Sequence, residues 1–90
     1  MIIIRIYRLG INQIMTLAEI VPPAQCNVTA VATENLDIQT RLYALGIFPG
    51  VSLSVLRYAP LGDPMQVQVG HSLISIRKQD ATLIAVEAVA

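Results

Sequence analysis

The sequence predicts a mainly β domain: a small, partly open β-barrel of about five strands, with one short α-helix between the first two strands. Apolar and polar residues alternate along several segments of this 90-residue chain, which is typical of strands that bury one face. A single segment carries the wider apolar spacing of a helix. Proline, glycine and aspartate fall between these segments, where turns are needed, and the length suits one domain.

A short helical turn and a strand are expected first. Thr16 and Glu19 have the spacing of a capping box, so a helical turn is expected directly after Thr16. The prolines at positions 22 and 23 end this turn, because proline disfavours a helical backbone in the residue before it. The segment CNVTAVAT, residues 26–33, then alternates in the manner of a strand.

The helix is expected next. Asn35 is a favourable N-cap, since its side-chain oxygen can accept a hydrogen bond from an amide of the first turn. One apolar stripe with the spacing i, i+4, i+7 is expected to face the core, and it consists of Ile38, Leu42 and Leu45. Gly46 is expected to end the helix, because the residue after a helix often takes a positive φ.

The period of two returns after residues 48–51, where proline and glycine occupy the positions that a type II turn requires. The remaining strands are expected at residues 51–58, 65–69, 74–77 and 81–89. A tight connection at Gly70–His71 and a turn at Gln79–Asp80 separate the last three of them.

The start of the chain differs in composition from the rest, and we divide the chain into an N-terminal extension, residues 1–14, and a domain, residues 15–90. Isoleucines alternate with Arg5 in the extension, but nothing nearby pairs with them through a short turn. Met15 opens a segment that itself resembles a translation start. Three interpretations of the extension stay open: a start assigned too early, an added strand, or a segment that lies on a membrane surface.

Composition and charge exclude several classes of protein. Apolar residues make up 54% of the chain, and six basic residues balance six acidic ones, so no basic surface for nucleic acid is expected. No apolar run has the length of about 18 residues that a membrane span needs, so direct membrane insertion is not expected. The single cysteine, Cys26, suits a reducing compartment, and the chain is expected to be cytoplasmic.

The residues that catalysis or metal binding would need are few. The single histidine, His71, lies in an expected turn, far in sequence from Cys26, and the carboxylates are dispersed. Structural zinc needs four Cys or His ligands, and this chain has one of each. We therefore expect no enzyme activity, no catalytic residue, no cofactor and no metal ligand. The alternative is a surface site at His71 that a neighbouring molecule completes.

The segment APLGDP, residues 59–64, is the expected contact with a protein partner. Two prolines fix φ, a glycine permits a left-handed residue, and the aspartate side chain is expected to bond to local backbone. The candidate partner-binding residues are Pro60, Leu61, Gly62, Asp63, Pro64 and, on the exposed side of the helix, Tyr43. Two interpretations of the leucine stay open. It either folds back to cover the barrel end or anchors a partner.

Two segments of the chain resemble the FeoA family, small accessory proteins of bacterial ferrous iron transport: RLYALGIFPGVSLSVLRYAPLGDPMQVQV and SIRKQDATLIAVE. The family pattern is a basic residue and Leu, Leu-Gly, Pro-Gly, an alternating strand, Ala-Pro-Leu-Gly-Asp-Pro, another strand and a Leu-Arg-Lys-like segment. The matching residues are, in order, Arg41, Leu42, Leu45, Gly46, Pro49, Gly50, Ala59, Pro60, Leu61, Gly62, Asp63, Pro64, Arg77 and Lys78. The resemblance covers residues 15–90, and His71 and the extension depart from the pattern.

The resemblance implies an SH3-like barrel in the cytoplasm, held near the inner membrane through its partner. That partner is the ferrous iron transporter FeoB, contacted at its cytosolic GTP-binding region. The family is not known for catalysis and brings no agreed set of metal ligands. The alternative function is a metal-sensing regulatory domain, because the same small barrel is appended to metal-dependent repressors. The apolar composition and the open barrel edge also favour weak self-association.

Overall fold

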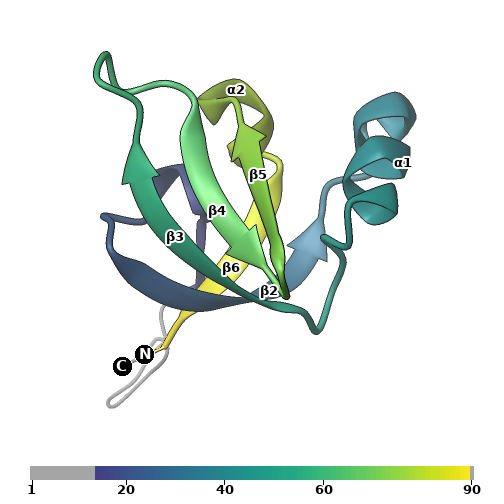
Figure 1. Ribbon diagram of the computed structural model, residues 1–90. Coiled ribbons are helices and arrows are strands. Elements are labelled where there is room, and N and C mark those ends of the chain that lie inside the picture. The colour runs from purple at the N-terminus through teal and green to yellow at the C-terminus, as the bar shows by residue number, and fades with distance from the viewer. Residues whose placement is uncertain (1–13, 90) are drawn as a thin grey trace.

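The computed structural model describes residues 14–89, which form one six-stranded antiparallel sheet that curls around a core and does not close (Figure 1). The elements are β1 (Ile14–Thr16), the 3-10 helix η1 (Leu17–Glu19), β2 (Ala24–Val31), α1 (Leu36–Ala44), β3 (Ser52–Tyr58), β4 (Met65–Val69), β5 (Ser72–Ile76), α2 (Lys78–Ala81) and β6 (Ile84–Ala88). The strand order is β1-β6-β2-β3-β4-β5, so β1 and β5 are the edges. The predicted fold class, a mainly β and partly open barrel with one short α-helix between two strands, is confirmed, but α1 lies between the second and third strands because β1 precedes them.

The core fills the inside of the curled sheet. Inward residues of neighbouring strands lie side by side, as Val55 does with Val67 and Val28 with Val86. The buried set consists of Leu17, Ile20, Cys26, Val28, Val31, Leu42, Ile47, Leu53, Val55, Met65, Val67, Ile76, Ala81, Ile84 and Val86. The register shifts between Val28 and Ala30, and again between Val55 and Arg57. Such irregularities increase strand bending and twist, which lets a short sheet curl.

The two capping signals and the turn at residues 48–51 form as predicted. Glu19 accepts a hydrogen bond from the Thr16 amide at 2.7 Å, as a capping box requires. The Asn35 side-chain oxygen accepts from the Ile38 amide at 3.1 Å and begins α1. In the turn, the Val51 amide donates to the Phe48 carbonyl at 3.2 Å. Local side-chain chemistry therefore sets where these elements begin.

The predicted core stripe of α1 is wrong at its last member. Leu42 is buried, but Leu45 is 43% exposed because α1 ends at Ala44 and the chain turns away at Gly46, where φ is 93°. Gly46 donates to the Tyr43 carbonyl at 3.0 Å, and Ile47 donates to the Leu42 carbonyl at 2.9 Å, the two bonds of a Schellman motif. Ile47 is fully buried and takes the place in the core that the stripe assigned to Leu45.

Three further predictions need correction. The sheet has six strands and not five, because β1 pairs with β6 from the far end of the chain, with Met15 opposite Val86. A short helix, α2, replaces the turn at Gln79–Asp80. The first strand, predicted at residues 26–33, lies two residues earlier in the structure, where it is β2.

The boundaries of the later strands differ from the predicted ones by a few residues. The structure places β5 at Ser72–Ile76 and β6 at Ile84–Ala88. The interpretations of the N-terminal extension concern residues 1–13, which lie outside the described residues. Its last residue, Ile14, begins β1.

Candidate partner-binding loop

The loop between β3 and β4 is a closed turn. The Ala59 amide donates to the Pro64 carbonyl at 2.9 Å, which closes the base of the loop. The Gly62 amide donates to the Ala59 carbonyl at 2.7 Å, which makes a β-turn with Pro60 and Leu61 at its two central positions. Because both bonds lie inside the loop, its shape does not depend on a bound partner.

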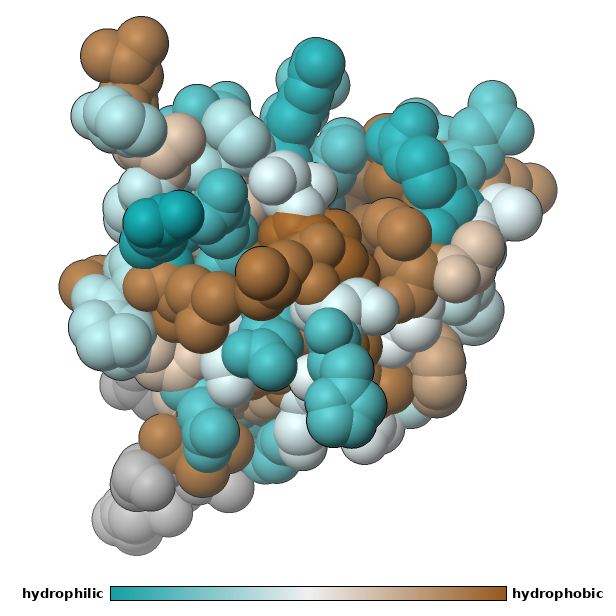
Figure 2. Space-filling view, viewed as in Figure 1, coloured by the Kyte–Doolittle hydropathy of each residue, from teal (hydrophilic) through white to brown (hydrophobic). Residues whose placement is uncertain are grey.

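Leu61 lies at the tip of this turn and is 97% exposed. The interpretation in which this leucine folds back and covers the barrel end is therefore wrong. The reason is the turn itself, which holds Leu61 at a corner and directs its side chain away from the sheet. Figure 2 shows hydrophobic atoms projecting from the end of the β3–β4 loop, separate from the other apolar surface on this face.

Asp63 ties the loop to α2. Its Oδ1 atom accepts a hydrogen bond from the Lys78 amide at 3.0 Å, at the start of that helix. The expectation that Asp63 bonds to local backbone is wrong, because this partner lies fifteen positions along the chain. The loop is thus fixed at its base, across its turn and against a second element.

Tyr58 and Lys78 pack against each other beside the loop, a contact that the sequence did not predict. The Tyr58 hydroxyl donates to the Ile20 carbonyl, and the Lys78 ammonium lies 4.1 Å from the centre of the Tyr58 ring. A hollow of about 360 Å³ opens beside the turn, lined by Arg57, Tyr58, Ala59, Pro60 and Gln66. The position of Arg57 and Tyr58 directly before APLGDP was the available signal.

Gly62 has a positive φ of 91°, and no heavy atom lies within 4 Å of the place a Cβ would take. We expect Gly62→Ala to lower the free energy of unfolding by about 1–2 kcal/mol, because the strain is in the backbone and not in packing. Gly62→Asn should cost less, since asparagine tolerates left-handed backbone. Urea unfolding of both variants tests this, and equal stability of Gly62→Ala and the wild type would contradict it.

Tyr43 lies on α1, and the structure does not bring it to the loop. Its side chain is 43% exposed and packs against the Phe48 ring, with the centroids 6.1 Å apart. In Figure 1, the β3–β4 loop lies at the upper left and α1 at the right, with β4 and β5 between them. The predicted contact residues therefore belong to two separate surfaces.

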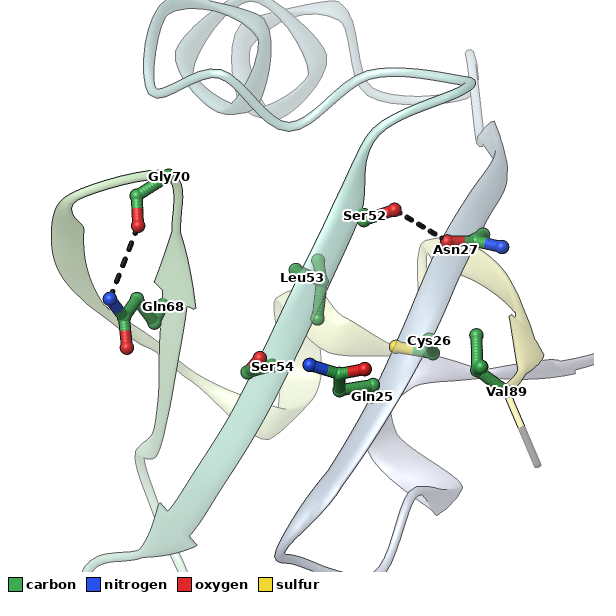
Figure 3. A pocket seen from close by; sticks show the side chains of 9 residues that line it. All are labelled: Gln25, Cys26, Asn27, Ser52, Leu53, Ser54, Gln68, Gly70 and Val89. Carbon is green, nitrogen blue, oxygen red and sulfur yellow. Dashed lines mark hydrogen bonds between the residues drawn. The ribbon is translucent and has the colours of Figure 1, made fainter.

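A polar hollow of about 480 Å³ lies over β2, β3 and the end of β4 (Figure 3). No charged side chain lines it, and its polar groups partly bond to each other. Ser52 Oγ donates to Asn27 Oδ1 at 2.7 Å, and Gln68 Nε2 donates to the Gly70 carbonyl at 3.2 Å. Cys26 lies buried at its base, and burial raises the pKa of its thiol to about 11. Burial therefore keeps this thiol in its protonated, less nucleophilic form.

Within residues 14–89, no three side chains among His, Cys, Asp and Glu come together as a metal site would require. Within the same part of the chain, no helix is long and apolar enough to span a membrane.

Residues 15–88 match the family model of the FeoA domain. The chain belongs to the FeoA family. The FeoA protein from Chlorobium tepidum, solved by solution NMR, is 39% identical, with a TM-score of 0.75 over 84% of this chain and 71% of that one. The iron(II) transport protein A from Clostridium thermocellum is 32% identical, with a TM-score of 0.77 over 83% of this chain and 46% of that one. The FeoA family consists of accessory proteins linked to ferrous iron transport and is not known for catalysis.

The same small β fold occurs in a second group of solved structures. A manganese-dependent transcriptional repressor is 13% identical, with a TM-score of 0.78 over 91% of this chain and 45% of that one. At this identity the likeness shows the fold alone. The SH3-like fold that the resemblance to FeoA implies is thereby confirmed.

Proposed function

We propose that this FeoA-family chain is a non-enzymatic cytoplasmic accessory protein of ferrous iron uptake that binds the cytosolic GTP-binding region of a FeoB-type transporter. The contact is the β3–β4 loop, with Leu61 as its anchor. The observation that carries the proposal is the 97% exposure of this leucine on a loop that its own hydrogen bonds hold in shape.

A rigid loop with an apolar tip suits binding for two reasons. Little conformational entropy is lost when a preformed loop docks, so more of the contact energy appears as affinity. A single large apolar side chain that enters a pocket often supplies much of the binding energy of an interface. An exposed leucine with no partner in its own fold is the kind of group that gains most from being covered.

The other residues of the loop have distinct roles. Pro60, Gly62 and Pro64 set the backbone path, and Asp63 holds the loop against α2 through the Lys78 amide. The hollow beside Pro60 carries the exposed Arg57 side chain, which is available to a carboxylate of the partner. Tyr43 is the second candidate contact, on the α1 side.

The direct test is a calorimetric titration of the full chain with the purified cytosolic region of the transporter, beside an unrelated GTPase of similar size. We expect saturable binding to the transporter region alone, and restored ferrous iron uptake when the chain is returned to a strain that lacks it. No binding to the region, with intact folded protein on both sides, would contradict the proposal.

The alternative function, a metal-sensing regulatory domain, rests on the shared fold with the repressor. Calorimetric titration of ferrous iron into the full chain separates the two functions. An accessory protein that acts through its loop needs no tight, stoichiometric iron binding. Such binding would favour the sensor.

A further inference from the structure

A groove of about 490 Å³ runs between α1, the edge strand β5 and α2. Its lining residues are Arg41, Leu42, Leu45, Ser75, Ile76, Arg77, Gln79 and Asp80. Figure 1 shows α1 standing beside the free edge of β5, on the side of the sheet away from the β3–β4 loop. The groove is thus a surface separate from the loop, and its volume lies in the usual range of ligand sites, roughly 300–1,000 Å³.

The backbone edge of β5 forms one wall of the groove. Within residues 14–89, β5 pairs with β4 on one side and with no strand on the other. Ser75 and Ile76 both line the groove although consecutive side chains of a strand point to opposite faces. What they share is the strand edge, where alternate residues direct N–H and C=O groups away from β4.

The edge lacks the protection that exposed strand edges usually carry. The sequence of β5 is SLISI, with no proline and no charged residue. Edge strands that must stay unpaired commonly carry lysine or proline, or a covering element. An open, uncharged edge beside a helix is the arrangement that β-augmentation uses.

The rest of the groove fits an extended peptide with apolar and acidic side chains. Leu42 and Ile76 are buried below it, and the half-exposed Leu45 forms an apolar wall directly after α1. In Figure 2, hydrophobic surface extends from the sheet toward α1. The rim of the groove carries two arginines and one aspartate. Arg41 forms an ion pair with Asp80 at 3.3 Å, but 63% of its side chain stays exposed. Arg77 is also exposed. The excess of positive charge favours a carboxylate on the occupant.

We propose that this groove binds an extended segment of a protein partner, which adds to the sheet as a strand beside β5. The segment has apolar residues at alternate positions, to pack against Leu45, and an acidic residue that reaches Arg41 and Arg77. A second copy of this chain fits less well, because α1 stands where the sheet of that copy would continue. A single extended segment needs only the width of one strand, about 5 Å from β5.

The first experiment selects binders of the full chain from a phage-displayed library of random dodecapeptides. We expect the selected peptides to share alternating apolar residues with an acidic residue. Arg77→Glu should then weaken the best peptide by about tenfold or more, since it reverses a rim charge. Gln25→Glu, which also makes the net charge more negative but at an exposed position of β2 outside the groove, is the control and should leave the affinity within about twofold. Leu45→Ser should weaken binding without any change of charge.

The second experiment tests backbone pairing directly, with two N-methylated versions of the best peptide. Only alternate N–H groups of an added strand face its neighbour, so methylation of one alternate set should abolish binding and methylation of the other set should not. Equal effects of the two sets, or proline-rich selected peptides, would overturn the proposal. A wild-type dimer in sedimentation that Leu45→Ser or Arg77→Glu dissociates would also overturn it, in favour of a second copy.

Discussion

Leu61→Asp is expected to weaken binding to the transporter's cytosolic region by about 30-fold or more, which corresponds to the loss of a contact worth about 2 kcal/mol. The substitution removes the apolar anchor and places a carboxylate where the partner would offer an apolar pocket. Burying that charge without a partner adds to the loss. Because Leu61 is 97% exposed and touches little of its own fold, the free energy of unfolding should change by less than about 0.5 kcal/mol.

The measurement is the calorimetric titration of the transporter region, repeated with two variants. Leu73→Asp is the matched control, since Leu73 is also a largely exposed leucine but lies on β5, away from the loop. Urea unfolding of each variant separates lost binding from lost fold. Unchanged binding by Leu61→Asp would contradict the role of the loop, and the next variant would then be Tyr43→Ala on α1.

Several elements are readable from the sequence because neighbouring residues determine them. The alternation in MQVQV predicts a strand, and β4 occupies Met65–Val69. Asn35 marks the start of α1 because its side chain satisfies an amide three residues ahead. Capping boxes, N-caps and proline–glycine turns act within one turn of the chain, so a single sequence contains all the information about them.

Other features depend on contacts between distant parts of the chain. Strand β1 is three residues long and becomes a strand only by pairing with β6. The helix α2 begins where Asp63, from another loop, accepts the Lys78 amide. Leu45 matches the apolar spacing of a helix, but the chain turns at Gly46 in a Schellman motif, so Ile47 and not Leu45 is buried in the core. Periodicity alone carries no signal for any of these.

The candidate loop could be located from sequence, but its surroundings could not. Pro60, Gly62 and Pro64 indicate a stiff turn in any context. The outward direction of Leu61 depends on the turn that the structure shows. The contact between Tyr58 and Lys78 depends on the packing of α2 near β3. The groove beside β5 is formed by three separate elements and leaves no trace in local spacing.

The thiol of Cys26 is expected to make stability depend on pH in the alkaline range. Burial raises its pKa from 9.0 to about 11, because the thiolate loses its hydration in the core. In the unfolded chain the thiol ionises near its ordinary pKa, so above pH 9 deprotonation favours unfolding. The stabilisation of the folded state by the neutral thiol is fully present below pH 9 and is lost as the pH rises toward 11. This difference in pKa between the folded and unfolded chain corresponds to about 3 kcal/mol of unfolding free energy.

The measurement is urea unfolding at intervals between pH 8 and pH 11.5, for the wild type and for Cys26→Ala. Every other ionisable group is the same in both proteins, so the difference between the two curves isolates Cys26. The variant starts less stable, because alanine leaves a small cavity where the sulfur packs in the core. The wild type should lose stability relative to the variant as the pH rises, by about 3 kcal/mol across this range. Parallel curves would mean that the thiolate is accommodated in the folded state and that Cys26 is less enclosed than its burial indicates.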